Sequence, residues 1–129
     1  MSDREELPAS RQAPNNPDSH AAQQPLDQMP VADLFAIALQ GDRDDESSWI
    51  PILELRRRGT AEVFDAALTH VNSHDPNSRV RGLDVLARLG AGKPDAERPH
   101  LRESISIATR HLADPESIVV QAAAWASAH

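Results

Sequence analysis

His70 and His74 are the side chains whose spacing comes closest to a metal site. They stand four residues apart, with Asp75 directly after them. Two histidines at this spacing on one helix can bind Zn²⁺. No glutamate lies between them, as it does in the His-Glu-x-x-His motif of metalloproteases. The second histidine also falls where a helix is expected to end, where positive charge suits the helix dipole. We therefore predict a solvated helix end and no metal.

The remaining residues offer no catalytic constellation. His100 and His111 stand among charged residues, with no nucleophile or paired acid nearby in sequence. Ser104 and Ser106 lack the glycines of a nucleophile elbow, and residues 90–93 lack the spacing of a phosphate-binding loop. The chain has no cysteine, so thiol chemistry, disulfides and cysteine-based zinc sites are excluded. The sequence predicts a protein that is not an enzyme and has no cofactor.

Binding chemistry is better represented, chiefly by arginine. Arginine forms bidentate bonds to carboxylates and phosphates and stacks on aromatic rings, which makes it common at interfaces. The alternative is ordinary surface charge that complements helix dipoles. The candidate partner-binding residues are Arg56, Arg57, Arg58, Arg79, Arg81, Arg88 and Trp49. The tryptophan stands beside an acidic segment, residues 42–46, and is expected to be half-exposed and able to anchor a partner.

Six amphipathic helices are predicted to carry these residues. Aromatic residues make up only 3% of the chain, so the core must be aliphatic, which favours helices over strands. From residue 31 onward, apolar side chains recur at helical spacing. The expected buried positions of the second, fifth and sixth helices are Ile50, Leu53, Ile52 and Leu55; Leu101, Ile105, Ala108 and Leu112; and Ile118, Val119, Ala122 and Trp125.

Helix boundaries are marked by turn residues. Glycines at 41, 59 and 90 are expected to end the first, second and fourth helices. Ser47 or Ser48 is an N-cap candidate for the second helix, and Thr60 is one for the third. Asp75-Pro76 and Asp114-Pro115 each predict an N-cap followed by proline at the first helical position.

The first thirty residues differ from the rest. They contain half of the ten prolines and few large apolar side chains. Such a segment cannot bury enough apolar surface to offset its ordering entropy. We predict a disordered tail over residues 1–30 and a folded domain over residues 31–129. The alternative for the tail is a recognition segment that folds on binding.

An internal repeat favours an array over a simple bundle. Asp75-Pro76-Asn77-Ser78 returns as Asp114-Pro115-Glu116-Ser117 at an offset of 39 residues, and Val80, Leu83 and Leu86 align with Val119, Ala122 and Trp125. Residues 75–90 resemble the second helix of HEAT repeats and of bacterial HEAT-like repeats of the PBS-lyase type. The resemblance implies an all-α fold, a short α-solenoid of about three antiparallel helical hairpins. It also implies that Arg81 reaches a turn carboxylate of an adjacent repeat.

The resemblance has two consequences for surfaces. Second helices of stacked hairpins line one face, which would gather the arginines into a stripe. The last helix lacks a Leu-Gly stop, so the array is expected either to fray there or to continue in a longer protein. An open apolar end would allow self-association.

The leading hypothesis is a non-catalytic scaffold that binds a protein or peptide on the second helices. Alternatives are a nucleic-acid-binding domain that uses the arginine stripe, a small acidic inhibitor or immunity-type protein, and an enzyme-associated domain as in phycobilin lyases. The net charge of −7 disfavours nucleic acid and anionic membranes. Without an apolar leader or spanning segment we expect a cytoplasmic protein, and the excess of arginine over lysine suggests a bacterial one.

Overall fold

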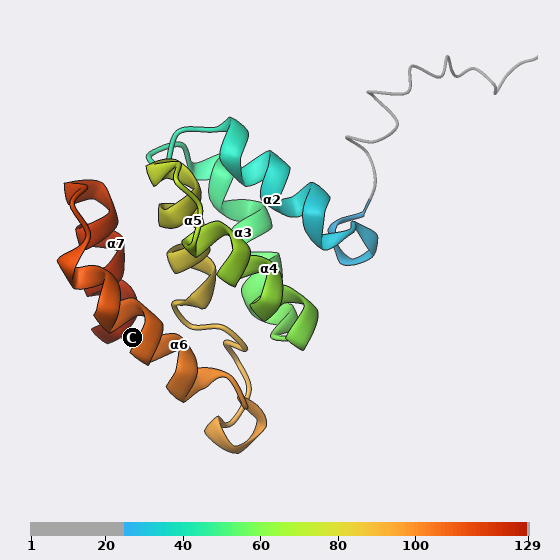
Figure 1. The fold of residues 1–129 in the computed structure, drawn as a ribbon. Helices are drawn as coiled ribbons and strands as arrows, with labels where there is room; N and C mark the ends of the chain where they lie inside the picture. Colours follow the sequence, from blue (N-terminus) through green and yellow to red (C-terminus); the bar gives the residue numbers. More distant parts are fainter. Residues whose placement is uncertain (1–24, 129) are drawn as a thin grey trace, which may run out of the picture.

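The computed structural model describes residues 25–128, and this part of the chain is helical without any strand (Figure 1). The six α-helices are α2 (Val31–Gln40), α3 (Trp49–Arg58), α4 (Ala61–Val71), α5 (Pro76–Leu86), α6 (Leu101–Arg110) and α7 (Ser117–Ala128). The prediction of an all-α fold with six helices is confirmed. The disorder predicted for the tail falls mainly on residues 1–24, which lie outside the described range.

Helix α5 lies at the centre of the packing. It contacts each of the other five α-helices, and it is flanked by α3 on one side and α7 on the other. Consecutive helices also pair, α2 with α3, α4 with α5, and α6 with α7. This order of contacts is the one expected for three stacked hairpins. Membership of the HEAT-like family stays a prediction.

The buried core follows the predicted periodicity most closely in α2, α4 and α5. Leu34, Phe35 and Ala38 of α2 are buried, as are Val63 and Ala67 of α4. In α5 almost every side chain is buried, because this helix is covered from all sides. Helices α4 and α5 approach closely at Gly82, where a Cβ atom would stand 2.6 Å from Val71 Cγ2 and 2.8 Å from the Ala67 carbonyl oxygen.

Helix ends match the turn chemistry at several positions. The Thr60 side chain accepts a hydrogen bond from the Val63 amide, and Asp75 accepts one from the Asn77 amide. Gly59 adopts the left-handed conformation (φ 58°) that ends α3. The prediction that the fourth helix runs to Gly90 is wrong, because α5 ends at Leu86. The turn that follows lets the Gly90 amide donate to the Arg56 carbonyl, 2.7 Å away, which ties α5 to α3.

Three predicted buried faces need correction. On α3 the large aliphatic side chains that are buried are Ile52 and Leu55, whereas Ile50 and Leu53 are 49% and 55% exposed. On α6 the buried residues are Ser104, Ile107 and Ala108, so the predicted stripe was rotated around the helix. On α7 Val119 and Ala122 are buried as predicted, but Ile118 and Trp125 are 43% and 38% exposed. These helices lie at the edge of the described array, where only one side is covered.

The packed part of the chain begins before Val31. A short 3-10 helix, η3 (Leu26–Gln28), precedes α2, and the Met29 side chain is buried. Arg58 Nη2 donates hydrogen bonds of 2.7 Å to the Leu26 and Met29 carbonyl oxygens. This arginine therefore fastens the segment before α2 to the end of α3.

Glu54 is expected to make the stability of the protein sensitive to acid. Hydrogen bonds from Arg57 lower the pKa of Glu54 to about 2, with burial opposing and Arg58 assisting. The carboxylate thus stabilises the fold fully above its ordinary pKa of 4.5, and this contribution is lost as pH falls from there to about 2. Arg57 is 62% exposed, so solvent weakens its interaction with Glu54. We therefore expect the free energy of unfolding to fall by only about 1 kcal/mol.

The measurement is urea unfolding between pH 6 and pH 2.5. Glu54→Gln should flatten the acid limb of the stability profile, whereas Asp65→Asn, on the exposed side of α4, should leave it unchanged. Parallel profiles for wild type and Glu54→Gln would contradict the assignment.

Within residues 25–128, no helix combines the length and apolar character needed to cross a membrane.

Candidate binding groove

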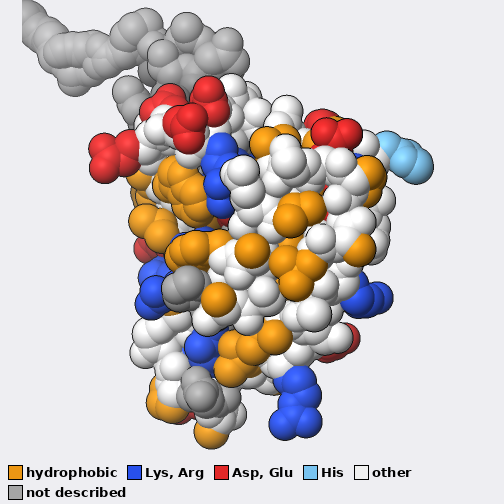
Figure 2. All heavy atoms as spheres, turned by 90° about the vertical axis from the view of Figure 1, so that its left-hand side faces the viewer, with side chains coloured by type: hydrophobic (Ala, Val, Ile, Leu, Met, Phe, Trp, Pro, Cys, Tyr) orange, Lys and Arg blue, Asp and Glu red, His pale blue; other side chains and the backbone are white. Residues whose placement is uncertain are grey.

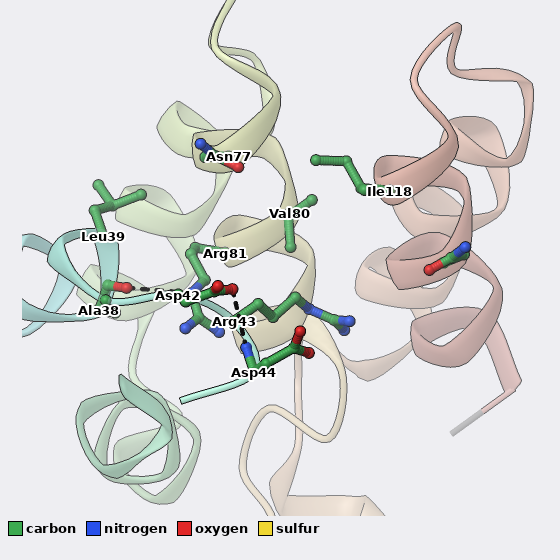
Figure 3. A pocket seen from close by; sticks show the side chains of 11 residues that line it. Ala38, Leu39, Asp42, Arg43, Asp44, Asn77, Val80, Arg81 and Ile118 are labelled. Atoms are coloured by element: carbon green, nitrogen blue, oxygen red, sulfur yellow. Dashed lines mark hydrogen bonds between the residues drawn. The ribbon is translucent and has the colours of Figure 1, made fainter. Parts of the chain in front are cut away.

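Two neighbouring cavities form a groove between the α2–α3 connector, α5 and α7. One has a volume of about 490 Å³ and is lined by residues of α2, the connector, α5 and α7. The other, of about 420 Å³, is lined by Arg43, Trp49, Arg56, Gln121 and Trp125. Arg43 and Gln121 line both cavities. The two cavities therefore form one continuous surface, called the groove. Figure 3 shows the larger cavity, with Ile118 projecting from α7 towards Val80 of α5.

Asp84 of α5 organises the floor of the groove. Its side chain is only 1% exposed and accepts hydrogen bonds from Arg43 Nε (3.1 Å), Arg43 Nη2 (2.8 Å) and Arg81 Nη1 (3.0 Å). The hydrogen bond to Asp84 raises the pKa of Arg43 above its ordinary value, against the effect of burial. The Asp84 carbonyl oxygen also accepts a hydrogen bond of 2.8 Å from Arg56 Nε. One residue of α5 therefore positions three arginines.

Arg56 lies between the two tryptophans of the chain. Its guanidinium carbon is 5.4 Å from the centre of the Trp49 ring and 5.3 Å from that of Trp125. Arg56 is only 6% exposed, and its Nη2 has no hydrogen-bond partner among the described residues. Burial lowers the pKa of Arg56 to about 10; Asp84 opposes this shift, while Arg88 and Arg43 reinforce it. Its positive charge is therefore only partly compensated.

Arg81 and Trp49 fix the connector against α5. Arg81 Nη2 donates to Ser48 Oγ, and Arg81 Nε donates to the Ala38 carbonyl oxygen at 3.3 Å. The Trp49 indole Nε1 donates to the Arg43 carbonyl oxygen at 2.7 Å. Arg43, Arg56 and Arg81 all lie within 5.4 Å of the Trp49 ring centre, a distance suited to cation–π interaction. Contacts within the protein itself thus fix the arginine side chains of the groove in place.

The surroundings of the groove combine apolar surface with acidic residues. Large apolar side chains are exposed on α3 and α7, which border the groove, namely Ile50, Leu53, Ile118 and Trp125. Figure 2 shows hydrophobic side chains spread over the α7 side of the molecule, with acidic side chains gathered along one edge. Asp42 and Asp44 line the larger cavity. A patch of exposed apolar residues rimmed by charge is typical of a protein interaction site.

The structure divides the predicted binding residues into two sets. Trp49, Arg56 and Arg81 line the groove, and Arg88 is exposed close enough to Arg56 to affect its pKa. Arg57, Arg58 and Arg79 line neither cavity. Trp49 is partly exposed, as expected. The prediction that Trp125 is buried is wrong, because α7 has no further helix in the described range to cover the position that matches buried Leu86.

The arginines outside the groove have structural partners. Both Arg57 and Arg58 bind the Glu54 carboxylate, at 2.7 Å and 2.8 Å. Arg79 forms a bidentate pair with Asp114, at 3.0 Å and 3.1 Å, across to the turn before α7. Burial would raise the pKa of Asp114, but hydrogen bonds from the Glu116 amide and Arg79 lower it overall. Arg79 thus reaches the turn carboxylate of the next hairpin, in place of Arg81, for which the resemblance implied this contact.

Asp84, Arg43 and Gln121 were not recognised in the sequence as functional candidates. Asp84 leaves a local signal, since it is an ionisable residue between Leu83 and Val85 on a helix turn that is otherwise apolar. Arg43 is the one basic residue in an acidic connector, and its partner is 41 positions away. Nothing in the sequence marks Gln121 as a candidate, because it is important only through its position facing both cavities.

Two histidines, His70 and His100, pack against phenylalanine rings. His70 stacks on Phe35 with ring centres 4.3 Å apart, its Nδ1 lies 3.0 Å from Ser78 Oγ, and burial lowers its pKa. His100 stacks on Phe64 at the same separation. His74 is exposed at the end of its turn. In the described part of the chain, no three histidine, aspartate or glutamate side chains stand close enough together to hold a metal ion.

Comparison of the chain with protein-family models, with curated proteins and with solved structures finds no match. The functional argument therefore rests on the groove itself.

Proposed function

We propose that the chain is a non-catalytic interaction module that holds a segment of a protein partner in the groove. The observation that carries the proposal is the groove on α3, α5 and α7, which combines preset arginines, two tryptophans and exposed apolar side chains. Tryptophan and arginine are the residue types most enriched among binding hot spots. They contribute most where packing already fixes them, because little conformational entropy is then lost on binding.

The apolar border gives such a partner area to bury. Leu53 of α3 stands four residues after Trp49, one helical turn along the same side. Ile118, Gln121 and Trp125 of α7 follow the i, i+3, i+7 spacing and all line the groove. A bound segment could therefore contact both helices across the arginine floor. This use of the second helices agrees with the HEAT-like resemblance, and a cytoplasmic scaffold in a bacterium remains the setting we propose.

Nucleic acid is a weaker candidate ligand. The net charge of the chain is −7, and two acidic residues line the larger cavity. Outside the groove, Arg57, Arg58 and Arg79 are bound to Glu54 and Asp114. A phosphate backbone would have to displace these pairs and also approach the acidic rim.

The test is capture of partners from a lysate of the source cells by the full chain and two variants. The groove variant carries Leu53→Asp and Ile118→Asp. The matched control carries Ile105→Asp and Leu112→Asp, which charge exposed apolar positions outside α3 and α7, the helices that border the groove. We expect a protein whose recovery falls at least about tenfold with the groove variant and is unchanged with the control.

Circular dichroism of both variants establishes that each still folds. Equal recovery of every captured protein by wild type and groove variant would refute the proposal, and so would equal losses with both variants.

A further inference from the structure

The charges of the groove identify the chemistry of its partner. We propose that it binds an acidic peptide segment, with one aspartate or glutamate side chain entering the cavity between Trp49 and Trp125 and meeting Arg43 and Arg56. This inference rests on the proposed function and adds the identity of the ligand. It commits to a carboxylate within a protein segment, flanked by apolar residues.

Positive charge in this part of the groove exceeds the negative charge that faces it. Two carboxylates face these arginines. Asp84 already accepts hydrogen bonds from Arg43 and Arg81 on both of its oxygens, and Asp44 of the connector lies close enough to act on the charge of Arg43. Arg56 Nη2 has no partner within the described residues. The Arg88 side chain is exposed and forms no hydrogen bond or ion pair with a described residue. A further carboxylate would therefore compensate charge that the chain itself leaves open.

Part of the Arg43 guanidinium is accessible to a ligand. In Figure 3 the Arg43 side chain extends from the connector across α5 in the direction of α7. It is 36% exposed, so part of the guanidinium remains open to solvent while the rest is held by Asp84. Arg56 lines the same cavity between the two indole rings. The two rings would screen a carboxylate here from part of the surrounding water, and ionic hydrogen bonds become stronger as water is excluded.

The acidic residues of the larger cavity limit the ligand to a single acidic residue near the tryptophans. Asp42 and Asp44 line the larger cavity, and a second carboxylate placed there would be repelled. That cavity also presents Val80 and Ile118, which suit a large apolar side chain. The expected ligand is thus an acidic residue close to a bulky apolar one. A polyanion fits less well, because its charges would extend over the two acids.

The test begins with the full chain as bait for a displayed library of random twelve-residue peptides. We expect enrichment of peptides with an aspartate or glutamate within a few residues of a large apolar side chain. One selected peptide is then synthesised, and its affinity is measured by fluorescence anisotropy. Gln121 is the position to vary, because it is exposed, lines both cavities and makes no described hydrogen bond.

The charge at position 121 should set the affinity. Gln121→Glu keeps the size of the side chain and places a negative charge beside the bound carboxylate, so Kd should rise about tenfold; Gln121→Lys should lower Kd about threefold. Ser106→Glu adds the same charge to the exposed side of α6 and should leave Kd unchanged.

The outcomes separate the two proposals. Selected peptides that lack acidic residues but lose binding with Leu53→Asp and Ile118→Asp would overturn the acidic ligand and leave the groove as a binding site. Acidic peptides that bind wild type, Gln121→Glu and Ser106→Glu equally would also overturn it. Selection of no peptide whose binding depends on the groove would count against both proposals.

Discussion

Replacing Asp84 with asparagine is expected to lower the free energy of unfolding by about 3 kcal/mol. The change removes the negative charge that holds Arg43 and Arg81, and it leaves two guanidinium groups at the groove floor without an ionic partner. Removing one member of a buried ion pair costs far more than the pair contributes, since the remaining charge stays out of water. Urea unfolding at neutral pH measures the loss directly.

Two comparisons show whether the loss arises from the buried charges. Asp65→Asn removes an exposed carboxylate on α4 and should change stability by less than about 0.5 kcal/mol. In an Arg81→Met background, Asp84→Asn should cost at least about 1 kcal/mol less than in the wild type, because one of the stranded charges is gone. Additive effects of the two changes would mean that Arg81 and Asp84 do not interact as the structure shows.

Gly82→Ala is the second change with a large expected effect, and here helix propensity and packing predict opposite signs. Gly82 lies inside α5, where alanine would ordinarily stabilise the helix by about 1 kcal/mol. The added methyl carbon, however, would lie 2.8 Å from both the Ala67 carbonyl oxygen and the Val71 amide nitrogen. Backbone atoms of α4 cannot turn aside as a side chain can, so α4 and α5 must separate. We expect a net loss of about 2–3 kcal/mol.

Thermal and urea denaturation of Gly82→Ala, followed by circular dichroism, measure this loss. Gly92→Ala is the comparison, because no atom lies within 4 Å of a Cβ there and only the positive φ of 90° opposes the change. We expect it to cost about 1 kcal/mol. A stabilised Gly82→Ala protein would show that α4 and α5 are not in the close contact described above.

The sequence predicted those parts of the fold that depend on nearby residues. Thr60 and Asp75 cap their helices as expected because capping needs only the two or three residues that follow. The buried face of α4 was found because a helix covered on one broad side keeps a clear apolar stripe. On α6 and α7 the apolar residues surround more of the helix, and only the position of the neighbouring helices decides which are buried.

The site was predicted in part for the same reason. Arg56, Arg81 and Trp49 stood out by residue type and by their places on expected second helices. The sequence could not reveal that Asp84 would hold two of the arginines, nor that Arg79 and Asp114 would pair over 35 positions. These contacts follow from how α5 is packed between its neighbours. Trp125 was predicted to be buried because it aligns with Leu86, but no described helix covers it and it is 38% exposed.

The placement of the two tryptophans provides a built-in optical reporter. The chain contains no tyrosine and only these two indoles, and both line the same cavity on either side of Arg56. Almost all of the near-ultraviolet emission of the protein therefore originates at the groove. A group that enters the cavity changes the environment of an indole directly, so its occupancy can be followed by intrinsic fluorescence, without any label attached to the protein or to the ligand.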